Sequence, residues 1–135
     1  MCGAVTYTAE VLPEMSACHC EMCRRWAGGP LFAVMAMTLE WTGDAQPAVI
    51  QSSDWAERGF CARCGSGLFY RITADVKVKG MTALAAGTLD DQSGLVLKRE
   101  WFIDMKPDYY AFEGERSCVT TEQIMARRAE ARGDA

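Results

Sequence analysis

Three of the seven cysteines and the only histidine lie within six residues, in the stretch CHCEMC at 18–23. Disulfides between residues so close in sequence are strained, whereas three thiolates on one loop can surround a single metal ion. Cys18, Cys20 and Cys23 therefore predict a metal site. This cluster restricts the folds open to the chain more than any other feature of the sequence.

Tetrahedral Zn²⁺ bound by these three thiolates keeps one coordination position free. Structural zinc sites are closed by four protein ligands, whereas catalytic sites hold three and leave the fourth position for water or substrate. The spacing therefore indicates an open site, with closure by His19 or a distant residue as the alternative. His19 sits between two ligands and is expected to point away from their shared ion, as a loop residue or as a support for the ligands.

The second cluster is Cys61-Ala-Arg-Cys64-Gly65, which has the pattern of a zinc knuckle. Two thiolates three residues apart can hold one ion while the amides of the turn between them point at sulfur. Gly65 suits the positive φ angle that such a tight turn often needs. This pair requires two further ligands from elsewhere in the chain.

Zinc fits these clusters better than the other uses of cysteine. A disulfide framework is disfavoured by the odd number of seven cysteines and by the reducing compartment expected for the chain. A thioredoxin-type pair would open a helix, but Cys61 and Cys64 precede a strand-like segment. The spacings match no ferredoxin pattern, and all-sulfur ligation disfavours Mg²⁺ and Ca²⁺.

The composition indicates one globular domain spanning residues 1–135. The hydrophobic fraction of 50% is enough for a packed core. The formal net charge of -4 disfavours nucleic-acid binding, and no apolar run is long enough to span a bilayer. The first ten residues lack the basic start and apolar stretch of a signal peptide, so we expect a cytoplasmic protein. Nothing in the sequence indicates an oligomeric state.

Short apolar runs separated by turn residues predict a mainly β fold of antiparallel sheets. The expected strands lie within residues 4–8, 30–41, 48–51, 67–73, 81–89, 95–104 and 109–112. One short helix is expected at the C-terminus. Thr120 or Thr121 can cap this helix, and Ile124 and Met125 supply a small apolar face.

Five stretches of the sequence together match a known pattern in their order and spacing. They are CGAVTY at 2–7, CHCEMCRRWAGG at 18–29, RGFCARCGSGLFY at 58–70, AAGTLDD at 85–91 and FIDMKPDYY at 102–110. Over roughly residues 2 to 112 the chain resembles the glutathione-dependent formaldehyde-activating enzyme (Gfa/CENP-V) family. The resemblance implies an Mss4-like fold with zinc knuckles, two zinc sites and carbon–sulfur lyase chemistry.

Carried over residue by residue, the resemblance implies that Cys18, Cys20 and Cys23 hold the catalytic zinc. A thiol bound to Zn²⁺ is deprotonated at neutral pH. Glutathione entering the free position would therefore be a thiolate that can add to formaldehyde or a related aldehyde. The implied activity is that of an S-(hydroxymethyl)glutathione synthase-like lyase acting on a small-molecule thiol and an aldehyde.

The same resemblance assigns Cys61 and Cys64 to one half of a structural zinc site, whose other half is an N-terminal CxC motif. Cys2 matches the second cysteine of that motif, and the first would fall one position before Met1. Two explanations are open. Either the natural chain begins earlier and includes the missing cysteine, or water, the Met1 amine or another side chain completes the site. In both cases Cys2 is expected to converge with the knuckle.

Glutathione carries two carboxylates that need cationic partners. Arg24 and Arg25, directly after the third cysteine, are the nearest candidates, with a solvated position as the alternative. Lys106 is a further candidate. Trp26 and Trp101 are expected in the core, with a place at a pocket as the alternative.

A non-catalytic, zinc-stabilised binding or chaperone module is a second hypothesis, because an Mss4-like fold can serve without catalysis. A closed site with four ligands would suffice there, whereas an open three-cysteine cluster favours the lyase. Redox chemistry of the methionine sulfoxide reductase type would need a reactive cysteine outside the zinc sites. Cys118 is the one candidate, and we expect it to be a semi-buried free thiol instead.

Overall fold

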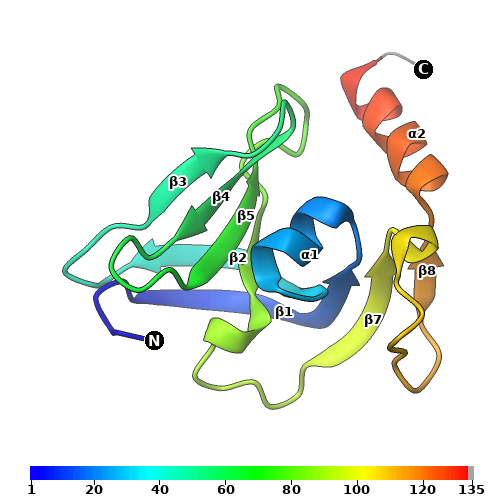
Figure 1. The fold of residues 1–135 in the computed structure, drawn as a ribbon. Coiled ribbons are helices and arrows are strands. Elements are labelled where there is room, and N and C mark those ends of the chain that lie inside the picture. The colour runs from blue at the N-terminus through cyan, green and yellow to red at the C-terminus, as the bar shows by residue number, and fades with distance from the viewer. Residues whose placement is uncertain (134–135) are drawn as a thin grey trace.

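The computed structural model describes residues 1–133, in which eight strands form one strongly bent sheet (Figure 1). The strands are β1 Tyr7–Cys18, β2 Leu31–Trp41, β3 Ala48–Gln51, β4 Ala56–Phe60, β5 Gly67–Ile72, β6 Thr82–Ala85, β7 Val96–Trp101 and β8 Ser117–Val119. Their order along the sheet is β3-β4-β5-β6-β2-β1-β7-β8. The pairs from β3 to β1 are antiparallel, whereas β1–β7 and β7–β8 are parallel.

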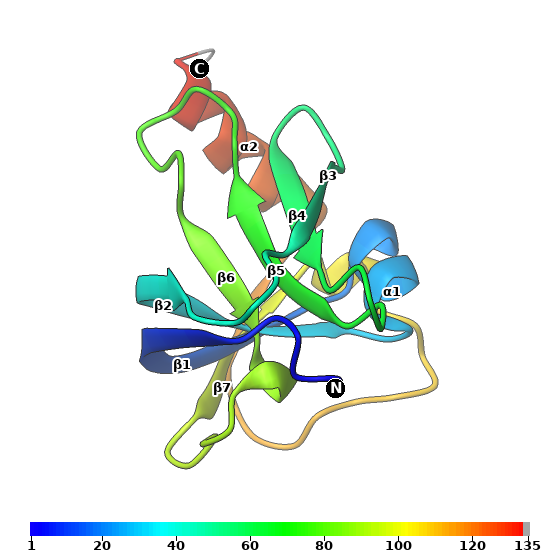
Figure 2. The same cartoon turned by 90° about the vertical axis from the view of Figure 1, so that its left-hand side faces the viewer.

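The hydrophobic core lies on one face of the central strands. Val34 on β2, Leu84 on β6 and Phe69 on β5 are direct cross-strand neighbours, and all three are buried. Figure 2 shows β4 and β5 crossing the direction of β1 and β2 at a steep angle. Because side chains on one face of a strand recur every second residue, this bend folds the apolar face onto itself.

Helix α1 (Glu21–Ala27) connects β1 to β2, and Figure 1 shows it between the β3–β5 part of the sheet and the β7–β8 part. It packs closely on β5. A Cβ atom on Gly67 would lie 2.7 Å from the indole nitrogen of Trp26, so only glycine fits at this crossing. The C-terminal end of α1 is thereby fixed against the sheet.

Helix α2 (Thr121–Arg132) follows β8 and begins with a capping box. The Thr120 hydroxyl accepts from the Gln123 N–H at 3.4 Å, and the Gln123 side chain accepts from the Thr120 N–H at 2.9 Å. Ile124 is buried, but Met125 is exposed, so the apolar face is narrower than expected. No helix within residues 1–133 has the length and apolar character needed to cross a bilayer.

The expectation of a mainly β fold with antiparallel strands, cysteine clusters and a C-terminal helix is confirmed. Helix α1 and the strands β4 and β8 were not expected. The prediction of a strand at 109–112 is wrong. Side chains occupy the backbone carbonyls there: Lys106 Nζ donates to the Tyr110 oxygen at 2.7 Å, and Arg116 donates to the Phe112 oxygen.

Candidate metal centre

Cys18, Cys20 and Cys23 converge where β1 meets α1, and their sulfur atoms all lie within 4.8 Å of one another. Cys18 ends β1, Cys20 is the N-cap of α1, and Cys23 lies in the first turn of the helix. The prediction that the three share one loop is therefore wrong. The Cys20 sulfur accepts from the Cys23 backbone N–H at 3.4 Å, so it replaces the oxygen that usually caps a helix.

The pKa values of the three cysteines are shifted in different directions. Hydrogen bonds from Cys18 and then Cys23, together with the nearby Arg58 charge, lower the pKa of Cys20 to about 2. The bond to Cys20 and burial raise the pKa of Cys18. A thiolate is the form of cysteine that binds metal. Cys20 is therefore the thiol of the cluster that most readily carries negative charge.

The donor set fits Zn²⁺. Four ligands at a Zn–S distance of about 2.3 Å place neighbouring sulfur atoms about 3.8 Å apart, which the observed spacing accommodates. Within the described residues, no fourth histidine, cysteine or carboxylate joins Cys18, Cys20 and Cys23. The cluster can therefore hold an ion that keeps one position for a ligand from outside the chain.

Arg58 on β4 reaches this cluster and was not identified from the sequence. Its Nη2 atom donates to the Cys23 sulfur at 3.3 Å, and its Nη1 atom donates to the Ser52 hydroxyl at 2.6 Å. Its guanidinium carbon lies 5.2 Å from the centroid of the Tyr70 ring. Arg58 is only 3% exposed. The one signal for it in the sequence is its place in the stretch RGFCARC, three residues before Cys61.

His19 is fully buried, and both of its ring nitrogens are occupied. Nε2 lies 2.7 Å from Oε2 of Glu100, and Nδ1 lies 2.8 Å from the Tyr110 hydroxyl. The other carboxylate oxygen of Glu100 accepts from Nε of Arg116 at 2.5 Å. His19 is therefore engaged away from the sulfur atoms, as its expected supporting role requires. Glu100 and Arg116 were missed because no local pattern marks them.

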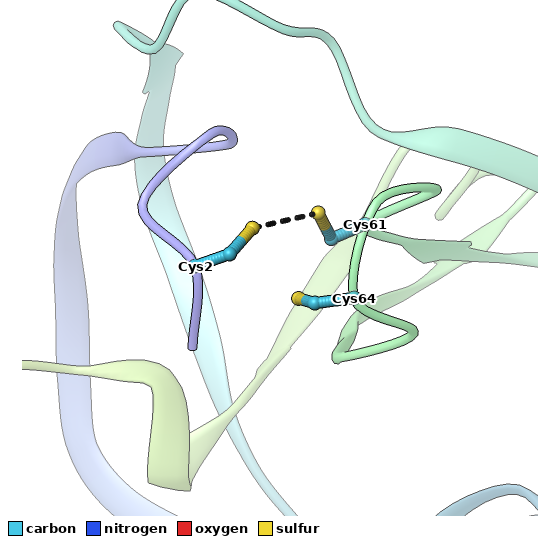
Figure 3. A group of neighbouring side chains, drawn as sticks. All are labelled: Cys2, Cys61 and Cys64. Carbon is cyan, nitrogen blue, oxygen red and sulfur yellow. Dashed lines mark hydrogen bonds between the residues drawn. The ribbon is translucent and has the colours of Figure 1, made fainter.

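The second cluster brings together Cys2, Cys61 and Cys64, whose sulfur atoms also lie within 4.8 Å of one another (Figure 3). The Cys2 and Cys61 sulfurs are 3.6 Å apart. Gly65 has the expected positive φ of 77°, and its N–H donates to the Cys61 carbonyl at 2.8 Å. The predicted knuckle turn and its convergence with Cys2 are thus present in the structure.

Ser66 adjoins this second cluster. Its hydroxyl lies 3.3 Å from the Cys64 sulfur and lowers the pKa of Cys64 to about 6. The Met1 amino group lies 3.5 Å from the same hydroxyl. Among residues 1–133, no fourth metal-binding side chain joins the cluster. The cluster combines one buried, one half-buried and one exposed cysteine, so it can accept a further ligand at its edge.

The three side chains expected as cationic partners of glutathione are Arg24, Arg25 and Lys106, and each has different contacts. Nε of Arg24 donates to the His19 carbonyl at 2.8 Å, so it braces the backbone between two cysteines of the first cluster. Arg25 is exposed and pairs with Glu21 at 2.5 Å. The Lys106 ammonium donates to the carbonyls of Pro107 and Tyr110. Of the three, Arg25 alone is exposed, whereas Arg24 and Lys106 are half-buried.

A cavity of about 250 Å³ lies beside the first cluster and is lined by Met22, Arg25, Trp26, Ile50, Ser52 and Arg58. A neighbouring cavity of about 200 Å³ shares Trp26 and Ile50 with it. Trp26 thus lines a pocket, which was the alternative to its expected core position. Trp101 is half-buried and lies beneath Arg99 and Arg127. Cys118 is exposed, and the expectation that it is semi-buried is wrong.

Comparisons with known proteins match most of the chain, including both cysteine clusters. The model of a family described as glutathione-dependent formaldehyde-activating enzyme matches residues 1–105. A Schizosaccharomyces pombe protein described as an uncharacterized lyase is 29% identical over 127 residues, which is 93% of this chain and 90% of that protein. The crystal structure of a Rhodobacter sphaeroides protein is similar in fold, with a TM-score of 0.53 and 23% identity. It matches 66% of this chain and 83% of that chain.

Proposed function

The chain belongs to the glutathione-dependent formaldehyde-activating enzyme family, as its motifs predicted, and from this premise we propose that it is a zinc-dependent carbon–sulfur lyase. The enzyme joins the thiolate of glutathione to formaldehyde or a related aldehyde. The description of the Schizosaccharomyces pombe relative as a lyase supports this class of reaction. We also propose that residues 1–135 act as one domain in the cytoplasm.

One observation carries the proposal: Cys18, Cys20 and Cys23 have no fourth partner among the described residues. His19, the nearest potential ligand in sequence, already binds Glu100 and Tyr110. A structural zinc site would be closed by a fourth protein ligand, whereas an open position admits a substrate. The geometry therefore favours chemistry on an exogenous ligand.

In this reaction the protein holds the three ligand sulfurs in position and compensates their negative charge. Zinc held by Cys18, Cys20 and Cys23 would lower the pKa of a thiol in its fourth position. That thiol would lose its proton to water, its sulfur would form a bond to the carbonyl carbon as the C=O π pair moves to oxygen, and the oxygen would take a proton back from water. Arg24 and His19 hold the segment between Cys18 and Cys20, so the ligand sulfurs keep their relative positions.

Arg25 is the proposed contact for a glutathione carboxylate. It lines the 250 Å³ cavity, and its side chain is 79% exposed. Its present partner Glu21 is also exposed, and such surface pairs contribute only about 0–1 kcal/mol. An incoming carboxylate can therefore replace Glu21 at little cost.

The test is to mix the zinc-loaded protein with glutathione and ¹³C-labelled formaldehyde and to follow exchange by NMR. The rate of exchange between hydrated formaldehyde and the S-hydroxymethyl adduct should rise in proportion to protein concentration. Removing zinc with a chelator should return the rate to its uncatalysed value. A rate that is the same with and without protein would favour the non-catalytic binding module.

A further inference from the structure

Arg58 carries a positive charge that is buried in the protein. It is 3% exposed, and within residues 1–133 no carboxylate pairs with its guanidinium. Its Nε atom is buried and has no hydrogen-bond partner among these residues. A buried cation costs several kcal/mol unless an opposite charge compensates it. The structure must therefore supply a negative charge other than a carboxylate.

The sulfur of Cys23 is positioned to supply that charge. It lies 3.3 Å from Nη2 of Arg58 and belongs to the three-cysteine cluster, whose members would bind a metal as thiolates. The Ser52 hydroxyl, 2.6 Å from Nη1, and the Tyr70 ring fix the guanidinium in this place. Neither Cys18 nor Cys20 accepts a side-chain hydrogen bond from an arginine in the described residues. Within the described residues, Arg58 thus forms a hydrogen bond to one of the three sulfurs.

We propose that Arg58 is a positioning residue whose hydrogen bond to the Cys23 sulfur makes that sulfur less reactive toward the aldehyde than the other sulfurs of the cluster. This inference rests on the proposed function, in which an electrophile enters beside three protein thiolates. A thiolate that accepts a charged N–H bond is a weaker nucleophile than one that does not, because part of its electron density is held by the donor. The exogenous thiolate, which lacks this bond, is then the preferred nucleophile.

The cavity beside the cluster supports this role. Arg58 and Ser52 both line it, as does Met22, the neighbour of Cys23 in sequence. A small electrophile in this cavity therefore lies beside the guanidinium that donates to the Cys23 sulfur.

The experiment compares methylation of the three cysteines in zinc-loaded wild type and Arg58→Met. Iodomethane is chosen because it is small enough to reach the buried Cys23; an S–C bond forms and iodide leaves. Mass spectrometry of peptides measures the ratio of label at Cys23 to label at Cys18 in the same molecules. The loss of one charged hydrogen bond should raise this ratio by about tenfold.

Arg71→Met is the matched control, since Arg71 lies on the adjacent strand β5, stacks on Phe69 and, within the described residues, forms no hydrogen bond to a cysteine. Its ratio should equal that of wild type. An unchanged ratio in Arg58→Met, or an equal rise at all three cysteines, would overturn the proposal. The reaction uses neither glutathione nor aldehyde, so a protein without lyase activity can still show the shift, and the two proposals fail separately.

A second variant covers the case in which Arg58→Met does not fold. Ser52→Ala leaves the charge in place but removes the hydroxyl that anchors Nη1. The loosened guanidinium should bond the Cys23 sulfur less often, and the labelling ratio should rise above that of wild type. A ratio identical to wild type in folded, zinc-loaded Ser52→Ala would contradict the proposal.

Discussion

Nε2 of His19 lies 2.7 Å from Oε2 of Glu100, and the two side chains are 0% and 6% exposed. This contact joins the residue between Cys18 and Cys20 to strand β7, 81 residues further along the chain. Arg116 binds the other oxygen of the same carboxylate. The first metal cluster is therefore held in place by buried hydrogen bonds from distant parts of the fold.

His19→Ala tests the contribution of this contact to stability. The substitution leaves buried acceptors on Glu100 and the Tyr110 hydroxyl without their partner, so the free energy of unfolding should fall by about 1–3 kcal/mol. Urea unfolding of the zinc-loaded protein measures the change. Tyr109→Ala is the control, because Tyr109 is 80% exposed and should change stability by less than about 0.5 kcal/mol. Equal effects of the two substitutions would show that the contact adds nothing.

Cys20→Ser should return the rate of thiol adduct formation to its uncatalysed value while leaving the fold largely intact. A serine oxygen can still cap α1, but it replaces one of three sulfurs that would hold the metal. Exchange NMR measures activity, and circular dichroism measures the fold. Cys118→Ser is the matched control, since Cys118 is exposed and belongs to neither cluster. Global unfolding of Cys20→Ser would instead make this cluster structural.

Local patterns in the sequence predicted the local parts of the structure. The spacing of Cys61, Cys64 and Gly65 predicted a knuckle turn, and Thr120 was one of two expected caps of α2. Helix α1 was missed because its seven residues are too few to show an apolar period, and a cysteine rather than an oxygen residue caps it.

Contacts between distant residues could not be predicted in this way. Arg58 approaches Cys23 across 35 positions of the sequence, and Glu100 approaches His19 across 81. The second contact depends on strand order, in which β7 lies beside β1 although five strands separate them in the chain. A charged residue in a strand looks like a solvent-facing one until the fold shows which face is covered.

Asp91→Ala should lower the melting temperature of the protein by an amount that depends on pH. The hydroxyl of Ser93, at 2.6 Å, and then its N–H, at 2.9 Å, hold the pKa of the Asp91 carboxyl below its usual range. The stabilisation is therefore full above the unfolded pKa of about 3.9 and is lost as the pH falls through the lower folded value. Melting temperatures of wild type and variant should differ at pH 7 and converge near pH 2.

The neighbouring residue provides the control for this pH dependence. Asp90 is also exposed, and its side chain makes no hydrogen bond within the described residues. Asp90→Ala should leave the melting temperature unchanged at both pH values. A gap between wild type and Asp91→Ala that stays constant with pH would mean that the charge of Asp91 is not involved.

A cysteine placed immediately before Met1 should raise both zinc retention and melting temperature. It would supply a fourth sulfur to Cys2, Cys61 and Cys64, and a closed structural zinc site contributes directly to folding. Zinc retention is measured by dialysis against a chelator, and a serine at the same position is the control. If the added cysteine behaves like serine, the N-terminal segment does not belong to the site.

The most direct test of the proposed function is a crystal structure of the zinc-loaded protein, determined with and without glutathione. The account predicts zinc bound by the sulfurs of Cys18, Cys20 and Cys23, with water in the fourth position alone and the glutathione sulfur in its place when glutathione is present. A protein side chain closing the fourth position in both structures, or no zinc at this cluster while its thiols remain reduced, would contradict it.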